Sequence, residues 1–484
     1  MRGIDRRDFL HRTLGSALAL PTAAPLLSLA GCDTDSAAGT EGFASSVAYQ
    51  RRTFDGAGPV REIEIEASEG TVEVAPGRSF KTWLYNGLYP GPEIRLTAGD
   101  VLRATVRNAL PEGTTIHWHG VPVPNAMDGV PGLTQEPIAT SESFVYEFPA
   151  TPAGSYMYHS HVGLQIDRGL IAPLIIEEKQ PHVDYDRDYT VVLDDFLPGA
   201  PEPLEGGGMM GGGMMGRRRG GMMAGQVPPY ESMLVNGRLP EAPVEFAARR
   251  GERVRLRLLN PSGATTFHFA IAGHRLLVTH TDGRPVEPFA VDSLYVSMGE
   301  RYDVVVEANN PGVWNVMAAV VEGDTPPARA VLRYADARGA TPPLEAVPEG
   351  LSRGRVLELA DLRGLGVPDR GQPDQTFDLV LSGGMMSSAW TINGQAYPDA
   401  EPLEIAEGQL VRFNMVNRSP MIHPMHLHGH FFRVADVLKE TVLVPPHMGR
   451  VSFDFVADNP GRWFFHCHNI YHLEQGMARE VRYV

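Results

Sequence analysis

One strand pattern occurs three times in this 484-residue chain and limits what it can fold into. Each copy begins with glycine, continues as an alternating strand and ends in asparagine, at residues 99–108, 251–260 and 408–417. Each block later has a small dipeptide ending in glycine that leads into a further strand, at Gly154, Gly312 and Gly461. A chain of this length exceeds one core. The repeat therefore predicts an all-β protein with three tandem β-sandwich domains, at residues 48–180, 186–335 and 352–484.

Composition agrees with this fold class and excludes some partners. The chain has 52 glycines and 40 prolines, which favour short strands and turns over helical bundles. The formal charge of −16 argues against nucleic acid as a partner and is compatible with cationic substrates. The two cysteines, Cys32 and Cys467, are not expected to form a disulfide.

The N-terminus indicates export. The sequence DRRDFL at residues 5–10 resembles a twin-arginine signal, and an apolar stretch follows it. That stretch ends in LAGC at residues 29–32, which resembles a lipoprotein cleavage box with Cys32 as the lipidated residue. The alternative is an ordinary cleaved signal with a cysteine nearby by chance. We expect a signal at residues 1–31, a tether at 32–47 and a periplasmic or otherwise extracytoplasmic protein, attached to a membrane only through Cys32.

Histidines gather in four clusters of the first and third blocks. The sequences are HWHG (117–120), HSH (159–161), HPMHLH (423–428) and HCH (466–468), the last followed by His472 and Met477, and together they hold ten of the 17 histidines. On a strand, residues i and i+2 share a face, so each His-x-His offers two imidazoles to one locus. Four such pairs are difficult to explain as core packing and predict metal binding.

The residues outside these four pairs suit a second kind of site. His423, Cys467, His472 and Met477 supply a thiolate, two imidazoles and a thioether, the ligands of an electron-transfer copper. If residues 462–477 begin as a strand, His466 and His468 point to one side and Cys467 to the other. Zinc takes four ligands at a site and would not need this many. In the second block, we interpret His268, His274 and His280 as ordinary core or surface histidines.

These motifs resemble those of the three-domain multicopper oxidases, over the whole mature chain. The similar stretches are MDGVPGL (127–133), YHSHVGLQ (158–165) and HCHNIYHLEQGMAREV (466–481), and they are most similar to the copper-resistance and laccase-like bacterial oxidases. The resemblance implies Greek-key cupredoxin-like domains. It also implies oxidation of a substrate, one electron at a time, coupled to four-electron reduction of O₂ to water.

The resemblance further implies four coppers. The type 1 copper would be held by His423, Cys467, His472 and, axially, Met477. The type 2 copper would take His117 and His426. The type 3 pair would take His119, His159, His161, His428, His466 and His468, whereas His430 is unassigned. Electrons would pass from the type 1 copper through Cys467 to the three-copper cluster between domains 1 and 3.

The protons for O₂ reduction need a donor. The resemblance places a carboxylate at Asp128, although Asp128-Gly129 also reads as a plain turn. Many bacterial relatives have a glutamate directly after the second type 1 histidine. Here Leu473 has that position and Glu474 follows it, so a relay role for Glu474 is in doubt.

The methionines raise the question of the substrate. Thioethers prefer Cu(I), and a Gly-rich loop at residues 206–225 within domain 2 carries six of them: Met209, Met210, Met214, Met215, Met222 and Met223. Met421 and Met425 lie near His423. We interpret the loop as a Cu(I)-gathering segment of a cuprous oxidase that also oxidises phenols. The alternatives are a flexible spacer in a general laccase, and a non-catalytic copper-binding or storage protein. A copper nitrite reductase would not need eight clustered imidazoles.

Overall fold

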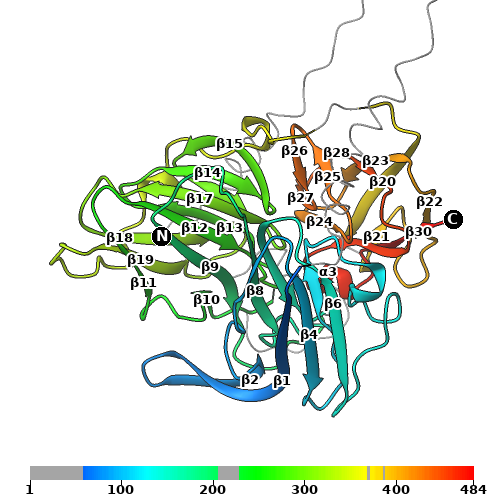
Figure 1. Cartoon of the computed structure of the whole chain (residues 1–484), viewed down its shortest axis with the longest axis horizontal. Helices are drawn as coiled ribbons and strands as arrows, with labels where there is room; N and C mark the ends of the chain where they lie inside the picture. The colour runs from blue at the N-terminus through cyan, green and yellow to red at the C-terminus, as the bar shows by residue number, and fades with distance from the viewer. Residues whose placement is uncertain (1–57, 205–227, 368–370, 385–386) are drawn as a thin grey trace, which may run out of the picture.

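The computed structural model describes residues 58–204, 228–367, 371–384 and 387–484. Its sheets form three groups along the chain, coloured blue to cyan, green, and yellow to red in Figure 1, which we call domains 1, 2 and 3. Each domain has two sheets, so the predicted all-β chain of three sandwiches is confirmed. The expected signal, the tether and the methionine-rich loop lie outside the described residues.

Domain 1 pairs a sheet of order β2-β1-β4-β6 with one of order β3-β8-β7-β5. Its strands are β1 (Val60–Ala75), β2 (Arg78–Tyr85), β3 (Ile94–Thr97), β4 (Val101–Asn108), β5 (His117–His119), β6 (Ser143–Pro149), β7 (Gly154–His159) and β8 (Ile171–Glu177), with a short helix η1 (Asn125–Met127). Buried Ile65 and Leu102 of the first sheet share one core with Trp118 and Leu174 of the second.

Domain 2 has sheets of order β10-β9-β12-β17-β14-β15 and β11-β19-β18-β13-β16. Its strands are β9 (Arg187–Phe196), β10 (Ser232–Val235), β11 (Val244–Ala248), β12 (Arg253–Leu259), β13 (Phe267–Ile271), β14 (Leu276–Thr281), β15 (Arg284–Val291), β16 (Leu294–Val296), β17 (Arg301–Glu307), β18 (Val313–Val320) and β19 (Ala328–Tyr334). The connection to domain 3 contains η2 (Glu349–Leu351) and η3 (Leu359–Asp361).

Domain 3 has sheets of order β21-β20-β23-β28-β25-β26 and β22-β30-β29-β24-β27. Its strands are β20 (Gln375–Gly384), β21 (Ser387–Ile392), β22 (Leu403–Ile405), β23 (Leu410–Asn417), β24 (His423–Leu427), β25 (Phe432–Val434), β26 (Val437–Lys439), β27 (Thr441–Val444), β28 (Gly449–Val456), β29 (Arg462–Cys467) and β30 (Ala478–Tyr483). The helix α3 (Ile470–Glu474) follows β29. None of the helices in the described residues is long and apolar enough to cross a membrane.

The sequence repeat corresponds to a repeated topology. In each domain the strand that carries the repeat pairs in parallel with the first strand, as β4 with β1, β12 with β9 and β23 with β20. On its other side it pairs antiparallel with β6, β17 or β28. The second sheets also agree, because each contains one parallel pair: β3 with β8, β11 with β19, and β22 with β30.

The asparagine that ends each repeat has the same buried role in all three domains. Its side-chain amide donates to two backbone carbonyls, and its oxygen accepts from the backbone N–H two residues later, at Asn108, Asn260 and Asn417. These bonds fix the loop after the strand, because buried carbonyls need partners. In domains 1 and 3 that loop leads directly to His117 and His423.

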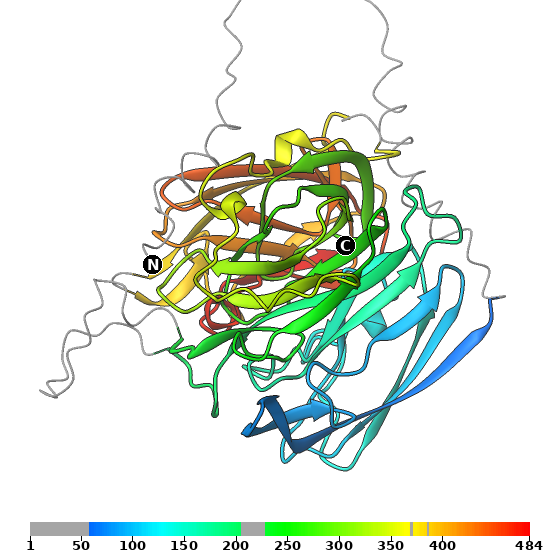
Figure 2. The ribbon, with the colours of Figure 1, turned by 90° about the vertical axis from the view of Figure 1, so that its left-hand side faces the viewer.

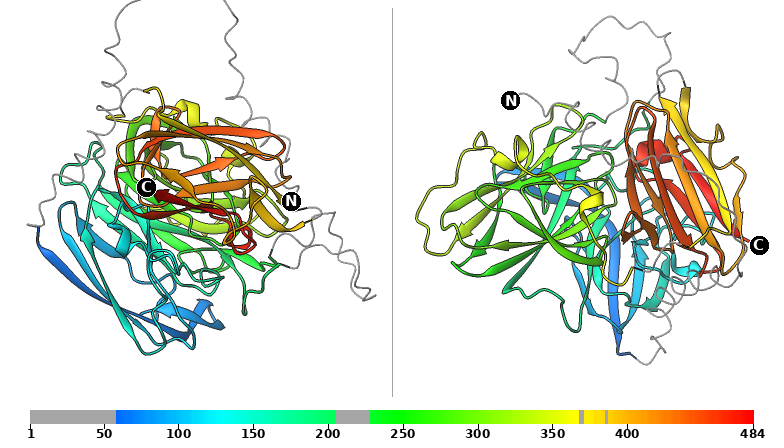
Figure 3. Two further views of the ribbon diagram at one scale, coloured as in Figure 1. Left: turned by 90° about the vertical axis from the view of Figure 1, so that its right-hand side faces the viewer. Right: turned by 90° about the horizontal axis from the view of Figure 1, so that it is seen from above.

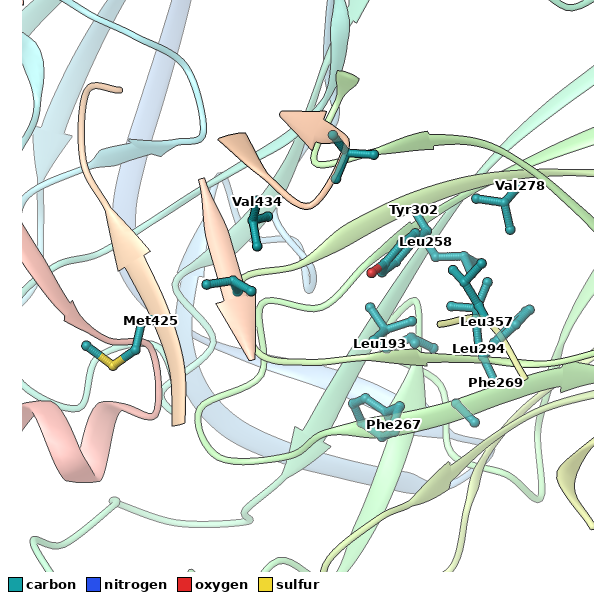
Figure 4. Packing of buried hydrophobic residues seen from close by; sticks show 14 of the residues in the cluster. Leu193, Leu258, Phe267, Phe269, Val278, Leu294, Tyr302, Leu357, Met425 and Val434 are labelled. Atoms are coloured by element: carbon teal, nitrogen blue, oxygen red, sulfur yellow. The ribbon is translucent and has the colours of Figure 1, made fainter. Parts of the chain in front are cut away.

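The three domains pack around one another. Figure 2 and the left view of Figure 3 show domain 1 beneath domain 3, and the right view of Figure 3 shows domains 2 and 3 side by side. One apolar cluster continues from domain 2 into domain 3, as Leu258 and Met425 illustrate in Figure 4. Between domains 1 and 3, the Asn125 side chain donates to the Arg462 carbonyl at 2.7 Å, and the Tyr471 hydroxyl to Asp167 at 2.5 Å.

Asn260→Ala tests the repeated asparagine in the domain without histidine clusters. The change removes the amide that donates to the carbonyls of Thr265 and Val296, so we expect a loss of about 2–4 kcal/mol in the free energy of unfolding, measured by urea denaturation. The control Asn309→Ala alters an exposed asparagine and should change stability by less than about 0.5 kcal/mol. Equal effects of the two changes would contradict this role.

Candidate metal centre

Strand register brings the histidine pairs of each domain together. In domain 1, β5 pairs antiparallel with β7, so His117 lies opposite His159. In domain 3, β24 pairs antiparallel with β29, so His426 lies opposite His466. Directly opposed residues have side chains close enough for contact. The remaining members, His119, His161, His428 and His468, lie at or just past the ends of these strands, and together the eight form what we call the eight-histidine cluster.

The cluster is assembled across the boundary between domains 1 and 3. His117 Nε2 is 3.4 Å from His426 Nε2, and His119 Nδ1 is 3.2 Å from His468 Nε2. The ring of His161 in domain 1 also lies 5.2 Å from that of His466 in domain 3, and within domain 3 His428 Nε2 is 3.0 Å from His466 Nε2. Neither domain alone gathers these nitrogens.

In most of the rings, the nitrogen that faces away from the cluster centre makes a hydrogen bond that orients the ring. The bonds run from Nδ1 to backbone or carboxylate oxygens: His117 to Asp128 O (2.8 Å), His159 to Ser160 O (2.8 Å), His426 to Glu440 O (3.0 Å), His428 to Asp128 Oδ2 (2.9 Å) and His466 to Cys467 O (2.9 Å). Metal-binding histidines are oriented in this way. The arrangement leaves Nε2 of these rings directed inward.

Burial favours the neutral form of several of these imidazoles. Together with the neighbouring imidazoles, it lowers the pKa of His159 to about 3 and that of His466 to about 4. His159 Nε2 and His161 Nε2 are buried, and neither has a hydrogen-bond partner among the described residues. Buried polar atoms without partners are costly. Converging imidazoles whose inward nitrogens have free lone pairs fit bound copper ions.

A second group of ligands surrounds Cys467. Its Sγ lies 3.6 Å from His423 Nδ1 and 3.5 Å from His472 Nδ1, and all three side chains are buried. Asn469 begins α3 by accepting hydrogen bonds from the N–H groups of Tyr471 and His472, which holds His472 in place. Burial raises the pKa of the Cys467 thiol, so a bound cation is what would stabilise the thiolate.

Met477 lies in the same turn. Its side chain is fully buried, its N–H donates to the His472 carbonyl at 3.0 Å, and its carbonyl accepts from the Cys467 N–H at 3.0 Å. The turns that flank α3 therefore carry Cys467 and Met477, α3 carries His472, and β24 supplies His423. The strand β29 ends at Cys467, with the thiol on one side and the rings of His466 and His468 in the eight-histidine cluster on the other.

Asp128 is a buried part of the cluster as well as a turn residue. It ends η1, and Gly129 after it has φ of 79° with no room for a Cβ beside the Ile116 carbonyl. The carboxylate is fully buried, with Oδ2 2.9 Å from His428 Nδ1 and Oδ1 3.3 Å from His117 Nδ1. Asp128 therefore contacts one histidine of domain 1 and one histidine of domain 3.

Glu440 is a site residue that sequence reasoning missed. Its Oε1 lies 3.2 Å from His119 Nε2 and its Oε2 lies 3.5 Å from His426 Nδ1, and Arg301 of domain 2 forms an ion pair with it. All these groups are buried. Glu440 stands in a short segment between β26 and β27 with no motif around it, so no sequence signal marks it.

Leu473 and Glu474 have different surroundings. A small cavity beside the cluster is lined by Leu473 together with His159, His161, His466 and His468, whereas Glu474 is exposed at the end of α3. The geometry therefore gives Glu474 no contact with the cavity. This agrees with the doubt about its relay role.

Other histidines and methionines occupy varied places. His268, His274 and His430 contact hydroxyl groups of Ser293, Tyr334 and Tyr483, respectively. Met421 and Met425, near His423 in the sequence, are buried and present no thioether to solvent. Sequence reasoning missed Met448, which is exposed and follows His447. The His447 N–H donates to the Ser419 carbonyl, and the Ser419 hydroxyl lies 2.7 Å from His423 Nε2.

Comparisons with known proteins agree with this geometry. Residues 66–181, 188–337 and 370–484 each match a family model described as multicopper oxidase. Multicopper oxidase MmcO of Mycobacterium tuberculosis is 34% identical, over 100% of this chain and 97% of that protein. A copper resistance protein A homolog of Pseudomonas syringae pv. tomato is 28% identical, over 87% and 92%. The solved laccase of Botrytis aclada is 27% identical, covers 88% of each chain and superposes with a TM-score of 0.74.

Proposed function

The chain belongs to the multicopper oxidase family, and we propose that it couples one-electron oxidation of Cu(I), and also of phenols, to four-electron reduction of O₂ to water. The observation that carries this proposal is that three consecutive residues contribute to both groups of candidate ligands. Cys467 faces His423 and His472, while its neighbours His466 and His468 belong to the eight-histidine cluster.

We assign the ligands by this geometry and by the family's motifs. His423, Cys467, His472 and Met477 would hold a type 1 copper, and His117 and His426 a type 2 copper. His428, His466 and His161 would hold one type 3 copper, and His119, His468 and His159 the other. When bound, the four coppers supply one-electron transfer and O₂ reduction. The protein holds the rings, excludes water from the buried sites and provides protons.

Asp128 is the residue that we propose to supply protons. Its carboxylate is buried against His117 and His428, so it would hold a proton at Oδ1 or Oδ2 beside the histidines of the eight-histidine cluster. Leu473 lines the nearby cavity in place of an acid, which leaves Asp128 and Glu440 as the carboxylates in contact with the cluster in the described residues.

The reducing substrate is the finer part of the proposal. The relatives' names divide between copper resistance and laccase, and so support both candidates. Exposed His447 and Met448 favour Cu(I), because they offer an imidazole and a thioether close to Ser419, which contacts His423. The methionines of residues 206–225 would gather Cu(I) for this surface. Export by the twin-arginine route with a lipid at Cys32 would place the enzyme where copper enters.

Cys467→Ser tests the enzymatic proposal. The oxygen is a poor substitute for the thiolate, so we expect the copper-loaded variant to lose both the intense blue colour and O₂ uptake with Cu(I) or phenol. Cys32→Ser removes the only other cysteine and should retain both. A copper-loaded wild-type protein without O₂ uptake would instead support the copper-storage alternative.

Asp128→Asn tests the proton donor. The amide is similar in size to the carboxylate but holds no transferable proton, so kcat should fall by about 10²–10⁴ while copper content and the blue absorbance stay unchanged. Asp128→Glu should recover part of the rate. Loss of copper from Asp128→Asn would show a role in positioning the histidines instead.

A comparison of two methionine variants tests the choice of substrate. One replaces the six methionines of residues 206–225 with leucine at constant loop length, and the other is Met448→Leu. We expect each to raise KM for Cu(I) several-fold and to leave kcat and KM for a phenol unchanged, measured by O₂ consumption. Unchanged Cu(I) kinetics in both variants would favour the general laccase.

A further inference from the structure

Two histidines and a glutamate converge at the junction of domains 1 and 2. Glu178 directly follows β8, and His182 lies in the connection to β9. His280, which the sequence alone suggested to be an ordinary histidine, belongs to β14. Glu178 Oε1 is 3.5 Å from His182 Nδ1 and 3.5 Å from His280 Nε2. The two rings are 4.7 Å apart between centroids and are inclined by 74°. None of these residues belongs to the copper sites proposed above.

The spacing suits a shared ion better than direct hydrogen bonds. Good side-chain hydrogen bonds have donor–acceptor distances of about 2.7–3.2 Å, and both contacts of Glu178 are longer. Ligands about 2.1 Å from a tetrahedral ion are separated by roughly 3.4 Å. The rings also meet like those of the copper site, where His423 and His472 are 4.9 Å apart and inclined by 65°.

The polar atoms of Glu178 and His280 that face away from the place where the three side chains meet also have polar neighbours. Glu178 Oε2 accepts from Arg255 at 3.4 Å. His280 Nδ1 lies 3.0 Å from Thr279 Oγ1, 3.4 Å from Arg255 Nη2 and 3.5 Å from Asp303 Oδ2. Such contacts orient metal ligands. Arg255 opposes a cation, but Asp303 lies 2.6 Å from its guanidinium and offsets its charge.

We propose that Glu178, His182 and His280 form a further metal site that binds one divalent first-row transition ion and joins the connection after domain 1 to domain 2. Two imidazoles and a carboxylate are suitable ligands for Zn²⁺ and Cu²⁺. The side chains of His182 and Glu178 are 20% and 17% exposed, so solvent can supply the remaining ligand. The site goes beyond the proposed oxidase activity, because it requires neither O₂ nor the Cys467 centre.

The test is a Zn²⁺ titration of the copper-replete holoenzyme. Calorimetry and elemental analysis should show one zinc per chain beyond the coppers, and the melting temperature should rise with zinc concentration. Glu178→Gln and His182→Asn should each weaken zinc binding at least tenfold and leave the blue absorbance unchanged. Glu177→Gln, which removes the adjacent carboxylate that pairs with Arg95, is the matched control and should bind zinc normally.

His182→Asn decides the matter if Glu178→Gln does not fold, because His182 is more exposed and has no contact with Arg255 among those described. A holoenzyme that binds no zinc beyond its coppers would overturn the proposal. So would variants that bind zinc as tightly as the wild-type protein. Added Cu²⁺ should displace the zinc, since copper forms the stronger complexes, and should give one more electron paramagnetic resonance signal that is absent in His182→Asn.

Discussion

The contact between the imidazoles of domain 1 and those of domain 3 is the constraint on which the rest of the structure depends. His117 faces His426, and His119 faces His468, across a boundary between two separately formed sandwiches. Buried imidazole lone pairs that point at one another repel unless a cation lies between them. The enzyme therefore has to dock two domains precisely, and bound copper would stabilise the docked form over the separated one.

Domain 2 contributes no imidazole to the eight-histidine cluster, but its residues contact the cluster and the residues beside it. Gly299, at φ of 84°, approaches His468 and His119 so closely that a Cβ would lie 3.0 Å from the first ring. Arg301 pairs with Glu440, and Lys439 pairs with Asp282 at 3.1 Å, all in buried positions. Loss of one partner from such a pair leaves a buried charge and is strongly destabilising. Domain 2 therefore acts on the site through packing and charge.

In domain 3, neighbouring residues of two paired strands contribute to both groups of candidate ligands. One strand end carries Cys467 between His466 and His468, and the opposite strand β24 carries His423 and His426. The same pair of strands therefore contributes to both sites, so their relative position is fixed by backbone hydrogen bonds and not by flexible side chains. The turn through α3 then adds His472 and Met477 from a few residues away.

The sequence by itself determined the fold class and the positions of the histidine clusters, because these depend on short-range periodicity. The alternation of β4, β12 and β23 and the His-x-His spacing are local features. Contacts between distant segments were decided only by the tertiary structure. Glu440 reaches His119, and His182 reaches His280, through domain packing that no local pattern encodes. The sequence also did not indicate which methionines are buried: Met421 and Met425 lie in the core, whereas Met448 is exposed.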